Sequence, residues 1–171
     1  MSVGLYPTNP SAEVKYLLSH SESKILFAED QEQVDKALEV IDSIPQLEKI
    51  VYFENKGMYS YDHPKLMTFS EFLDIGKSEY ESFPEFVENE IKKLDDNDVA
   101  IMVYTSGTTG KPKGVIHTHK SLIHGGWNTM IAHELTKEDN GLCVLPLCHI
   151  NAQAVSVMGT LVFILSFFSR A

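Results

Sequence analysis

The chain has 171 residues, of which 43% are hydrophobic and 22% charged, a composition typical of a globular domain and unlike that of a disordered or collagen-like chain. Its net charge of −10 argues against a nucleic-acid-binding protein, because such a protein needs a basic face for the phosphates. The acidic excess lies in residues 1–100, with nine Lys and Arg against 21 Asp and Glu, whereas residues 101–171 have five against three, a net charge of +2. An anionic ligand is therefore easier to place in the second part of the chain.

Short strands and amphipathic helices alternate through the first 55 residues. Asn9 is the predicted N-cap of a helix whose first residue is Pro10. Residues 24–29 are a predicted strand, 31–44 a helix with its apolar residues three and four apart, and 47–55 another strand. A strand, a helix and a strand within about 30 residues are typical of a parallel crossover unit. The pattern predicts an α/β fold with helices on the sheet.

Further along, residues 68–80 are a predicted helix begun by Thr68 or Ser70, and the segment "FPEFVENEIKKL" is another. The uninterrupted apolar run 99–105 is typical of a strand that is buried on both faces. A second strand over 114–119, a helix over 119–133 and a strand-like run over 141–149 are expected to follow.

An uncharged stretch, residues 154–168, has about 15 residues, short of the roughly 20 that a membrane-spanning helix needs. We therefore expect a buried core element there and no transmembrane segment. The N-terminus lacks the basic and apolar regions of a signal peptide, and the chain has two cysteines, Cys143 and Cys148. These features predict free thiols and a cytoplasmic location.

The segment "YTSGTTGKPKGV", residues 104–115, concentrates glycines, hydroxyls and lysines between two apolar runs. Its glycines allow the backbone to approach a ligand closely, and its hydroxyl and backbone N–H groups can donate to phosphate oxygens. Two lysines add positive charge. A solvated hairpin loop is the alternative interpretation, but the contiguous pattern after a buried strand favours a phosphate site. The spacing excludes the G-x-x-x-x-G-K-[ST] loop, because residue 105 is Thr and residue 112 is Pro.

This segment resembles the phosphate-binding signature of the adenylate-forming enzymes, which include acyl-CoA synthetases, aryl-CoA ligases, firefly luciferase and peptide-synthetase adenylation domains. Residues 4–30 and 145–162, "LPLCHINAQAVSVMGTLV", resemble further parts of the CoA synthetases in the same order. The resemblance implies a partial doubly wound α/β sheet, with residues 1–171 as an incomplete AMP-binding N-terminal domain truncated at both ends. It also implies ATP-dependent activation of a carboxylic acid to an acyl-adenylate and then an acyl-CoA. A fatty acid is the first candidate for this acid.

The resemblance assigns roles to individual residues. Lys113 would stabilise the departing pyrophosphate, and Thr105 would lie near Mg²⁺. His149 would border the adenylate and the acyl pocket, with Asn151 among the pocket residues; a histidine satisfied at a strand end is the alternative. Small molecules, namely ATP, a carboxylic acid and coenzyme A, are the implied partners. The residues implied to line the triphosphate of ATP are Thr105, Ser106, Gly107, Thr108, Thr109, Gly110, Lys113 and Gly114.

The 171 residues contain neither the Tyr-Gly-x-Thr-Glu-like motif whose glutamate helps hold Mg²⁺ in the family nor the later ribose-binding aspartate and catalytic lysine. We therefore expect that this chain alone does not complete the reaction, and a non-catalytic nucleotide-binding or interaction protein remains an alternative. Another adenylate-forming activity, on aryl or carnitine-like acids for example, also remains open. A zinc site is disfavoured, because there is no C-x-x-C pair and Cys143 and Cys148 would face opposite sides of a straight strand.

Overall fold

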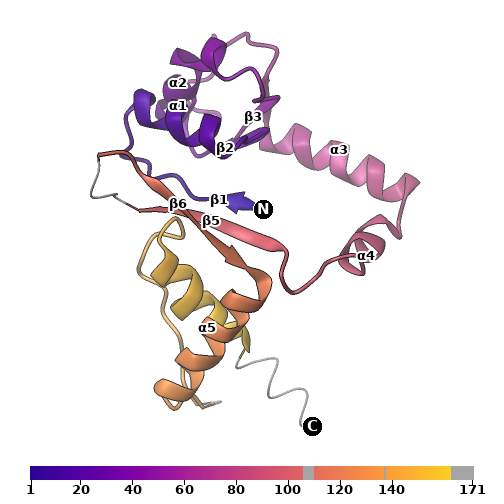
Figure 1. Cartoon of the computed structure of the whole chain (residues 1–171). Helices are drawn as coiled ribbons and strands as arrows, with labels where there is room; N and C mark the ends of the chain where they lie inside the picture. The colour runs from indigo at the N-terminus through magenta and orange to yellow at the C-terminus, as the bar shows by residue number, and fades with distance from the viewer. Residues whose placement is uncertain (106–109, 137, 163–171) are drawn as a thin grey trace. The chain divides into compact units, whose positions relative to one another are not determined.

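The computed structural model describes residues 1–105, 110–136 and 138–162. The chain divides into two compact units, which are described separately. One unit is the continuous segment Leu5–Lys93, and the other combines Met1–Gly4 with Leu94–Ala171. Both units combine helices with strands (Figure 1), so the predicted α/β class is confirmed. The strands form two three-stranded sheets, one in each unit.

The unit Leu5–Lys93 is built on a parallel sheet. Its strands β2 (Ile25–Ala28), β3 (Lys49–Tyr52) and β4 (Leu66–Thr68) lie in chain order. Helix α2 (Gln31–Glu39) connects β2 to β3, whose pairing is parallel from Ile25 opposite Lys49 to Ala28 opposite Tyr52. The predicted crossover unit is therefore confirmed, although the helix ends earlier than expected and continues as a short 3-10 turn, η1 (Ile41–Ser43).

The core of this unit lies on one face of the sheet. Strand β2 alternates, with Leu26 and Ala28 buried and Ile25 and Phe27 exposed. Apolar residues from α1 (Ser11–His20) and α2 pack against the buried side. Because both helices turn one apolar stripe to the sheet, a short chain segment buries a continuous cluster. The buried residues of this cluster are Val14, Leu18, Leu26, Ala28, Val34, Ala37, Ile41, Ile44, Leu47, Ile50 and Met58.

The first helix begins one residue later than predicted. Pro10 has an extended backbone (φ −71°, ψ 160°), and its carbonyl accepts from the N–H groups of Glu13 and Val14. Pro10 is therefore the N-cap residue, and no side chain caps this helix. Asn9, the predicted cap, lies one residue further out, where its backbone N–H donates to the Tyr6 carbonyl in a preceding turn.

Helix α3 (Phe69–Ser82) starts at the first of its two predicted caps. The Thr68 hydroxyl accepts from the Glu71 N–H at 3.1 Å, while the Glu71 carboxylate accepts from the Thr68 N–H at 2.8 Å. This reciprocal capping box satisfies two backbone donors that the helix itself leaves unpaired. The shorter helix α4 (Phe86–Ile91) falls inside the second helical segment expected in this region.

The other unit contains a mixed sheet in the order β1 (Ser2–Val3), β5 (Val99–Thr105) and β6 (Lys113–Thr118). Strand β1 is parallel to β5, and β6 is antiparallel to it. Helix α5 (His119–Ala132) follows β6 directly, with the Thr118 hydroxyl accepting from the Ser121 N–H as its cap. Both strands and this helix match the predicted elements closely.

One expectation in this unit holds only in part, and another is wrong. Strand β5 is buried on both faces only at the adjacent residues Val103 and Tyr104, whereas the preceding four residues are half-buried, because β1 pairs with only two positions of a narrow sheet. Residues 141–148 form no strand. Pro146 has no N–H for a strand ladder, and its carbonyl instead accepts from the His149 N–H at 2.9 Å, which closes a turn.

Residues 150–162 are helical and include a π-helical segment, η2 (Ala152–Met158), which lies alongside α5 (Figure 1). The two helices approach closely at glycines. A Cβ atom on Gly126 would lie 2.6 Å from the Met158 carbonyl oxygen, and one on Gly159 would lie 3.1 Å from Thr129 Cγ2. Ala152 and Val162 are buried, whereas Val155 and Leu161 are exposed, so the predicted core element has one buried face in its described part.

Candidate functional site

Thr105 and Lys113 close the glycine-rich turn. Thr105 is the last residue of β5, Lys113 is the first of β6, and the two are direct partners in the antiparallel ladder. Direct partners place their side chains on the same face of the sheet, with Cβ atoms about 4.5–5.5 Å apart. Both residues are exposed. The ladder therefore places a hydroxyl-bearing and an ammonium-bearing residue next to each other where the turn begins and ends.

The alternative hairpin interpretation is thus correct about the backbone, since the turn joins two antiparallel strands. Of the predicted phosphate-lining residues, Ser106, Gly107, Thr108 and Thr109 lie outside the described residues. Gly110 has φ +93°, a conformation that residues with a Cβ atom rarely adopt. The exit of the turn accordingly requires glycine, and a Cβ atom there would meet nothing within 4 Å.

Gly114 has a packing reason to be glycine. It pairs with Tyr104, and a Cβ atom on it would lie 2.7 Å from Met102 Sδ and 3.5 Å from Tyr104 Cε1. These side chains belong to the face opposite Thr105 and Lys113, because residues one apart along a strand alternate between faces. Gly114 thereby lets Met102 and Tyr104 cover the rear of the hairpin. Its part in binding phosphate stays a prediction.

The electrostatic setting of Lys113 suits an anion. Within the part of the chain that the structure describes, no carboxylate lies within ion-pair distance of the Lys113 ammonium. Its unit also contains the segment of the sequence with positive net charge. A lysine that is not neutralised by an acidic neighbour keeps its full attraction for an anionic ligand.

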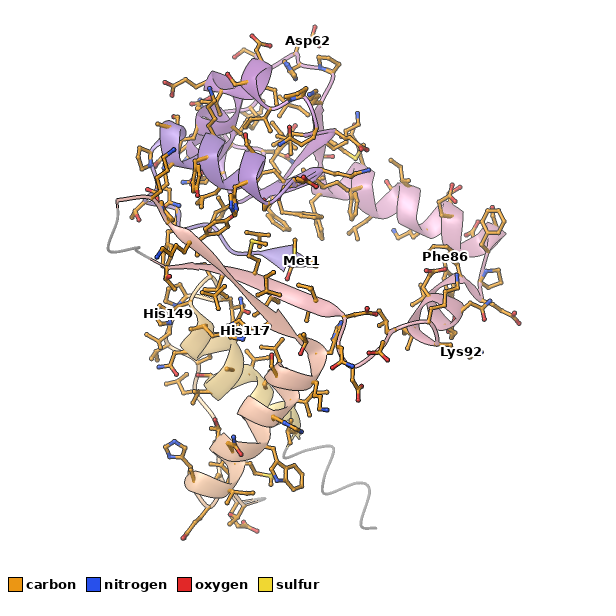
Figure 2. The ribbon with its side chains drawn as sticks, viewed as in Figure 1. Met1, Asp62, Phe86, Lys92, His117 and His149 are labelled. Carbon is orange, nitrogen blue, oxygen red and sulfur yellow. The ribbon has the colours of Figure 1, made fainter. Side chains whose placement is uncertain are left out.

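His149 caps the helix that carries Asn151. The His149 carbonyl accepts from the Ala152 N–H at 3.1 Å, and its Nδ1 atom accepts from the Asn151 N–H at 3.1 Å. A side-chain acceptor bound to an N–H group in the first turn is the N-cap arrangement, here made by an imidazole. Both His149 and Asn151 are exposed, and Figure 2 labels His149. The alternative position at a strand end is wrong, because the residue follows a turn and begins a helix.

The predicted site residues therefore form two groups within one unit. Thr105, Gly110, Lys113 and Gly114 belong to the hairpin, and His149 and Asn151 belong to the turn and helix that follow α5. No hydrogen bond joins the two groups among the described residues. Sequence reasoning missed Gln153, whose side-chain amide donates to the Leu147 carbonyl within the turn before His149. A side chain that binds a backbone carbonyl leaves no residue-type signature in the sequence.

The histidines and cysteines form no common cluster within the described residues. His117 pairs with Ile101 in the sheet, whereas His119 is the first residue of α5, so the two do not lie on one strand. Cys143 is exposed, and burial raises the pKa of the half-buried Cys148 thiol. The described ranges contain no cluster of three or more His, Cys, Asp or Glu side chains that could hold a metal ion. They also contain no helix of the length and apolar character needed to cross a membrane.

The sequence matches the family model "AMP-binding enzyme" over residues 1–163. The chain belongs to this family. Among curated relatives it is 30% identical to the long-chain-fatty-acid–CoA ligase ACSBG2 of Xenopus laevis, with 94% of this chain and 22% of the relative aligned. It is also 30% identical to the long-chain-fatty-acid–CoA ligase FadD15 of Mycobacterium tuberculosis, with 92% and 25% aligned.

Solved structures agree with this assignment at the level of the fold. A luciferase-like enzyme from Zophobas morio superposes with a TM-score of 0.67 at 23% identity, covering 94% of this chain and 34% of that one. ATP-bound MatB from Rhodopseudomonas palustris gives a TM-score of 0.65 at 19% identity, covering 94% and 28%. The chain spans about a quarter of the length of the curated ligases that it matches.

Proposed function

We propose that this AMP-binding chain takes part in the ATP-dependent activation of a carboxylic acid, as a portion of an acyl-CoA synthetase N-terminal domain. The observation that carries the proposal is the ladder pair Thr105–Lys113 at the mouth of the glycine-rich turn, in a chain of this family. In this reaction a carboxylate attacks the α-phosphorus of ATP, an acyl-adenylate forms, and pyrophosphate leaves. The thiol of coenzyme A then takes the acyl group.

Lys113 is the residue best placed to act on the leaving group. Two anions must approach each other in the first step, and a strongly charged pyrophosphate must depart. Fixed cations and hydrogen-bond donors on the phosphates lower that barrier, since charge develops on the oxygens that they contact. Lys113 supplies the cation, and its backbone is held in the ladder directly after the turn. The hydroxyls of the turn and its backbone N–H groups supply the donors.

Thr105 fits the role predicted for it at Mg²⁺. Magnesium prefers oxygen ligands and in nucleotide sites binds one or two protein groups together with the substrate phosphates. The Thr105 hydroxyl is exposed, lies on the Lys113 face and is an oxygen donor of this kind. When bound, the ion would neutralise phosphate charge next to Lys113. Thr105 would help to hold it, and coenzyme A remains the expected acceptor of the acyl group.

The acid is proposed to be a fatty acid, because the curated relatives at 30% identity are named long-chain-fatty-acid–CoA ligases. His149 and Asn151 are proposed to border the adenylate and the acyl group. Both lie exposed at the start of a helix, where their side chains can contact a ligand. Aryl and carnitine-like acids are the competing substrates within the family.

A second candidate function is nucleotide binding without ligation. It is supported by the same ladder pair, Thr105–Lys113, which could hold the phosphates of a nucleotide whether or not an acid is activated. The chain alone is expected to form no acyl-CoA from ATP, a fatty acid and coenzyme A. Appearance of the thioester in that assay would contradict this expectation.

A non-hydrolysable fatty-acyl-adenylate analogue separates the two candidates. If the site serves acid activation, the chain binds the analogue more tightly than AMP, and His149→Ala removes most of that advantage while leaving the affinity for ATP unchanged. Equal affinities for the analogue and AMP would favour plain nucleotide binding. The same titration with a benzoyl-adenylate analogue compares aryl with fatty acids.

A further inference from the structure

Three contacts hold the turn that contains His149. The carbonyl of its first residue, Pro146, accepts a hydrogen bond from the His149 N–H at 2.9 Å, so residues 146–149 form a closed turn. At the centre of the turn, the Gln153 side-chain amide donates to the Leu147 carbonyl. The next residue, Cys148, packs against Gly4, where an added Cβ atom would lie 2.8 Å from Cys148 Cα.

The Gln153 contact reaches across the start of the helix. Gln153 lies four residues after His149, one turn into the helical run, and its side chain returns to the carbonyl two residues before His149. A carbonyl at the centre of a turn points away from the local backbone donors, so a side-chain amide is a fitting partner. The contact therefore joins the turn to the helix on both sides of His149.

The fixed backbone selects one tautomer of the His149 imidazole ring. Nδ1 of His149 accepts a hydrogen bond from the Asn151 N–H at 3.1 Å, so Nδ1 carries no proton. In the neutral ring the proton then resides on Nε2. Because His149 is exposed and no described residue hydrogen-bonds its Nε2, that N–H group is available as a donor to a ligand.

We propose that Gln153 is a positioning residue that holds the turn 146–149 so that His149 presents Nε2–H as a hydrogen-bond donor. This inference rests on the proposed function only for the identity of the ligand, an acyl-adenylate. A donor suits that ligand, whose carbonyl and phosphate oxygens accept hydrogen bonds and carry negative charge. His149 thus serves as a neutral donor, since a ring whose Nδ1 is occupied by the Asn151 N–H cannot offer that nitrogen as a base.

The test is the ¹⁵N spectrum of the histidine side chains in the 171-residue chain, recorded at about pH 8, where an ordinary imidazole is neutral. His149→Ala assigns the His149 signals among the seven histidines. The wild-type ring is expected to show a protonated Nε2 and an unprotonated Nδ1. Gln153→Leu removes the donor, and Gln153→Glu keeps the shape but replaces the donor with an acceptor; in both, the signals are expected to move toward a mixture of tautomers.

Thr160→Val is the matched control. Thr160 Oγ1 donates to the Ser156 carbonyl at 2.8 Å in the same helical run, so its loss removes a similar hydrogen bond without touching the turn. The His149 signals are expected to stay unchanged in this variant. Leu and Glu are both good helix formers, and far-UV circular dichroism should match the wild type in all three variants.

The outcomes separate this inference from the proposed function. Unchanged His149 signals in both Gln153 variants would overturn the positioning role, whatever the chain binds. A changed tautomer together with an analogue affinity that His149→Ala leaves intact would support the positioning role and contradict the proposed ligand. A changed tautomer with analogue binding weakened in Gln153→Leu by most of the loss seen in His149→Ala would support both.

Discussion

Thr105 and Lys113 face each other directly across the β5–β6 hairpin, one ending the strand that enters the glycine-rich turn and the other beginning the strand that leaves it. Their register places a hydroxyl and an ammonium group on one face, while Met102 and Tyr104 fill the opposite face over Gly114. Further along the face of Thr105 and Lys113 lies the apolar pair Val103–Val115, with Val103 buried, so the polar part of this face is confined to the end next to the turn. This position is the structural basis for assigning ligand binding to the turn.

Neighbouring glycines on α5 are expected to respond oppositely to alanine. A Cβ atom on Gly126 would lie 2.6 Å from the Met158 carbonyl oxygen, and backbone cannot move aside easily, so Gly126→Ala should destabilise the unit by about 1–3 kcal/mol. A Cβ atom on Gly125 would meet Ala154 Cβ at an ordinary 3.8 Å. Gly125→Ala should therefore be neutral or stabilising by up to about 1 kcal/mol, since alanine favours helix. Urea denaturation measures both; equal effects would contradict the close helix crossing.

The capping box of α3 makes that helix sensitive to acid. Hydrogen bonds from the Thr68 backbone N–H and hydroxyl lower the pKa of the Glu71 carboxyl. A carboxyl with a lowered pKa in the folded state stabilises it above the ordinary glutamate range, and this contribution disappears as the pH falls through the lowered value. Helical circular dichroism should therefore decline on acidification.

The difference between the wild type and Glu71→Gln isolates this effect from the other carboxyls. The variant has no charge to lose at residue 71, so its acid-induced decline should be the smaller of the two. Glu79→Gln, on the same helix and without a capping role, serves as the control and should behave like the wild type. Identical acid profiles for wild type and Glu71→Gln would show that the capping box contributes nothing measurable.

The two cysteines should differ in reactivity. Burial raises the pKa of Cys148, which reduces its thiolate fraction at neutral pH, and the side chain is also partly covered. Cys143 is exposed. A thiol reagent should therefore label the chain in two phases, and Cys143→Ser should remove the fast one. Loss of the slow phase instead would contradict the packing of Cys148 against Gly4.

Sequence patterns predicted the elements whose signals are local. The apolar spacing of 31–44 and the Thr68–Glu71 pair each contain enough information within one or two turns to define a helix. The pairing of β5 with β6 follows from a short connection between two apolar runs. The family was recognisable at the turn because its residues are contiguous, and the family model matches residues 1–163.

Features that depend on distant contacts were not predictable in this way. The apolar run 141–149 looks like a strand, but no strand pairs with it, and Pro146 begins a turn instead. The packing reason for Gly114 appears only once Met102 lies next to it. Likewise, Gln153 became relevant through a carbonyl that any residue type could have supplied. Each of these outcomes is decided by which segments meet in three dimensions.

Titration of ATP into the chain, followed by calorimetry, tests the central claim most directly. A charge-assisted hydrogen bond contributes about 1.5–3 kcal/mol, so Lys113→Ala should weaken ATP binding roughly ten- to hundredfold. Lys111→Ala, which removes the same charge two residues earlier in the turn, should weaken it much less. An ATP affinity that is the same in the wild type and Lys113→Ala would contradict the assignment of the turn to the phosphates.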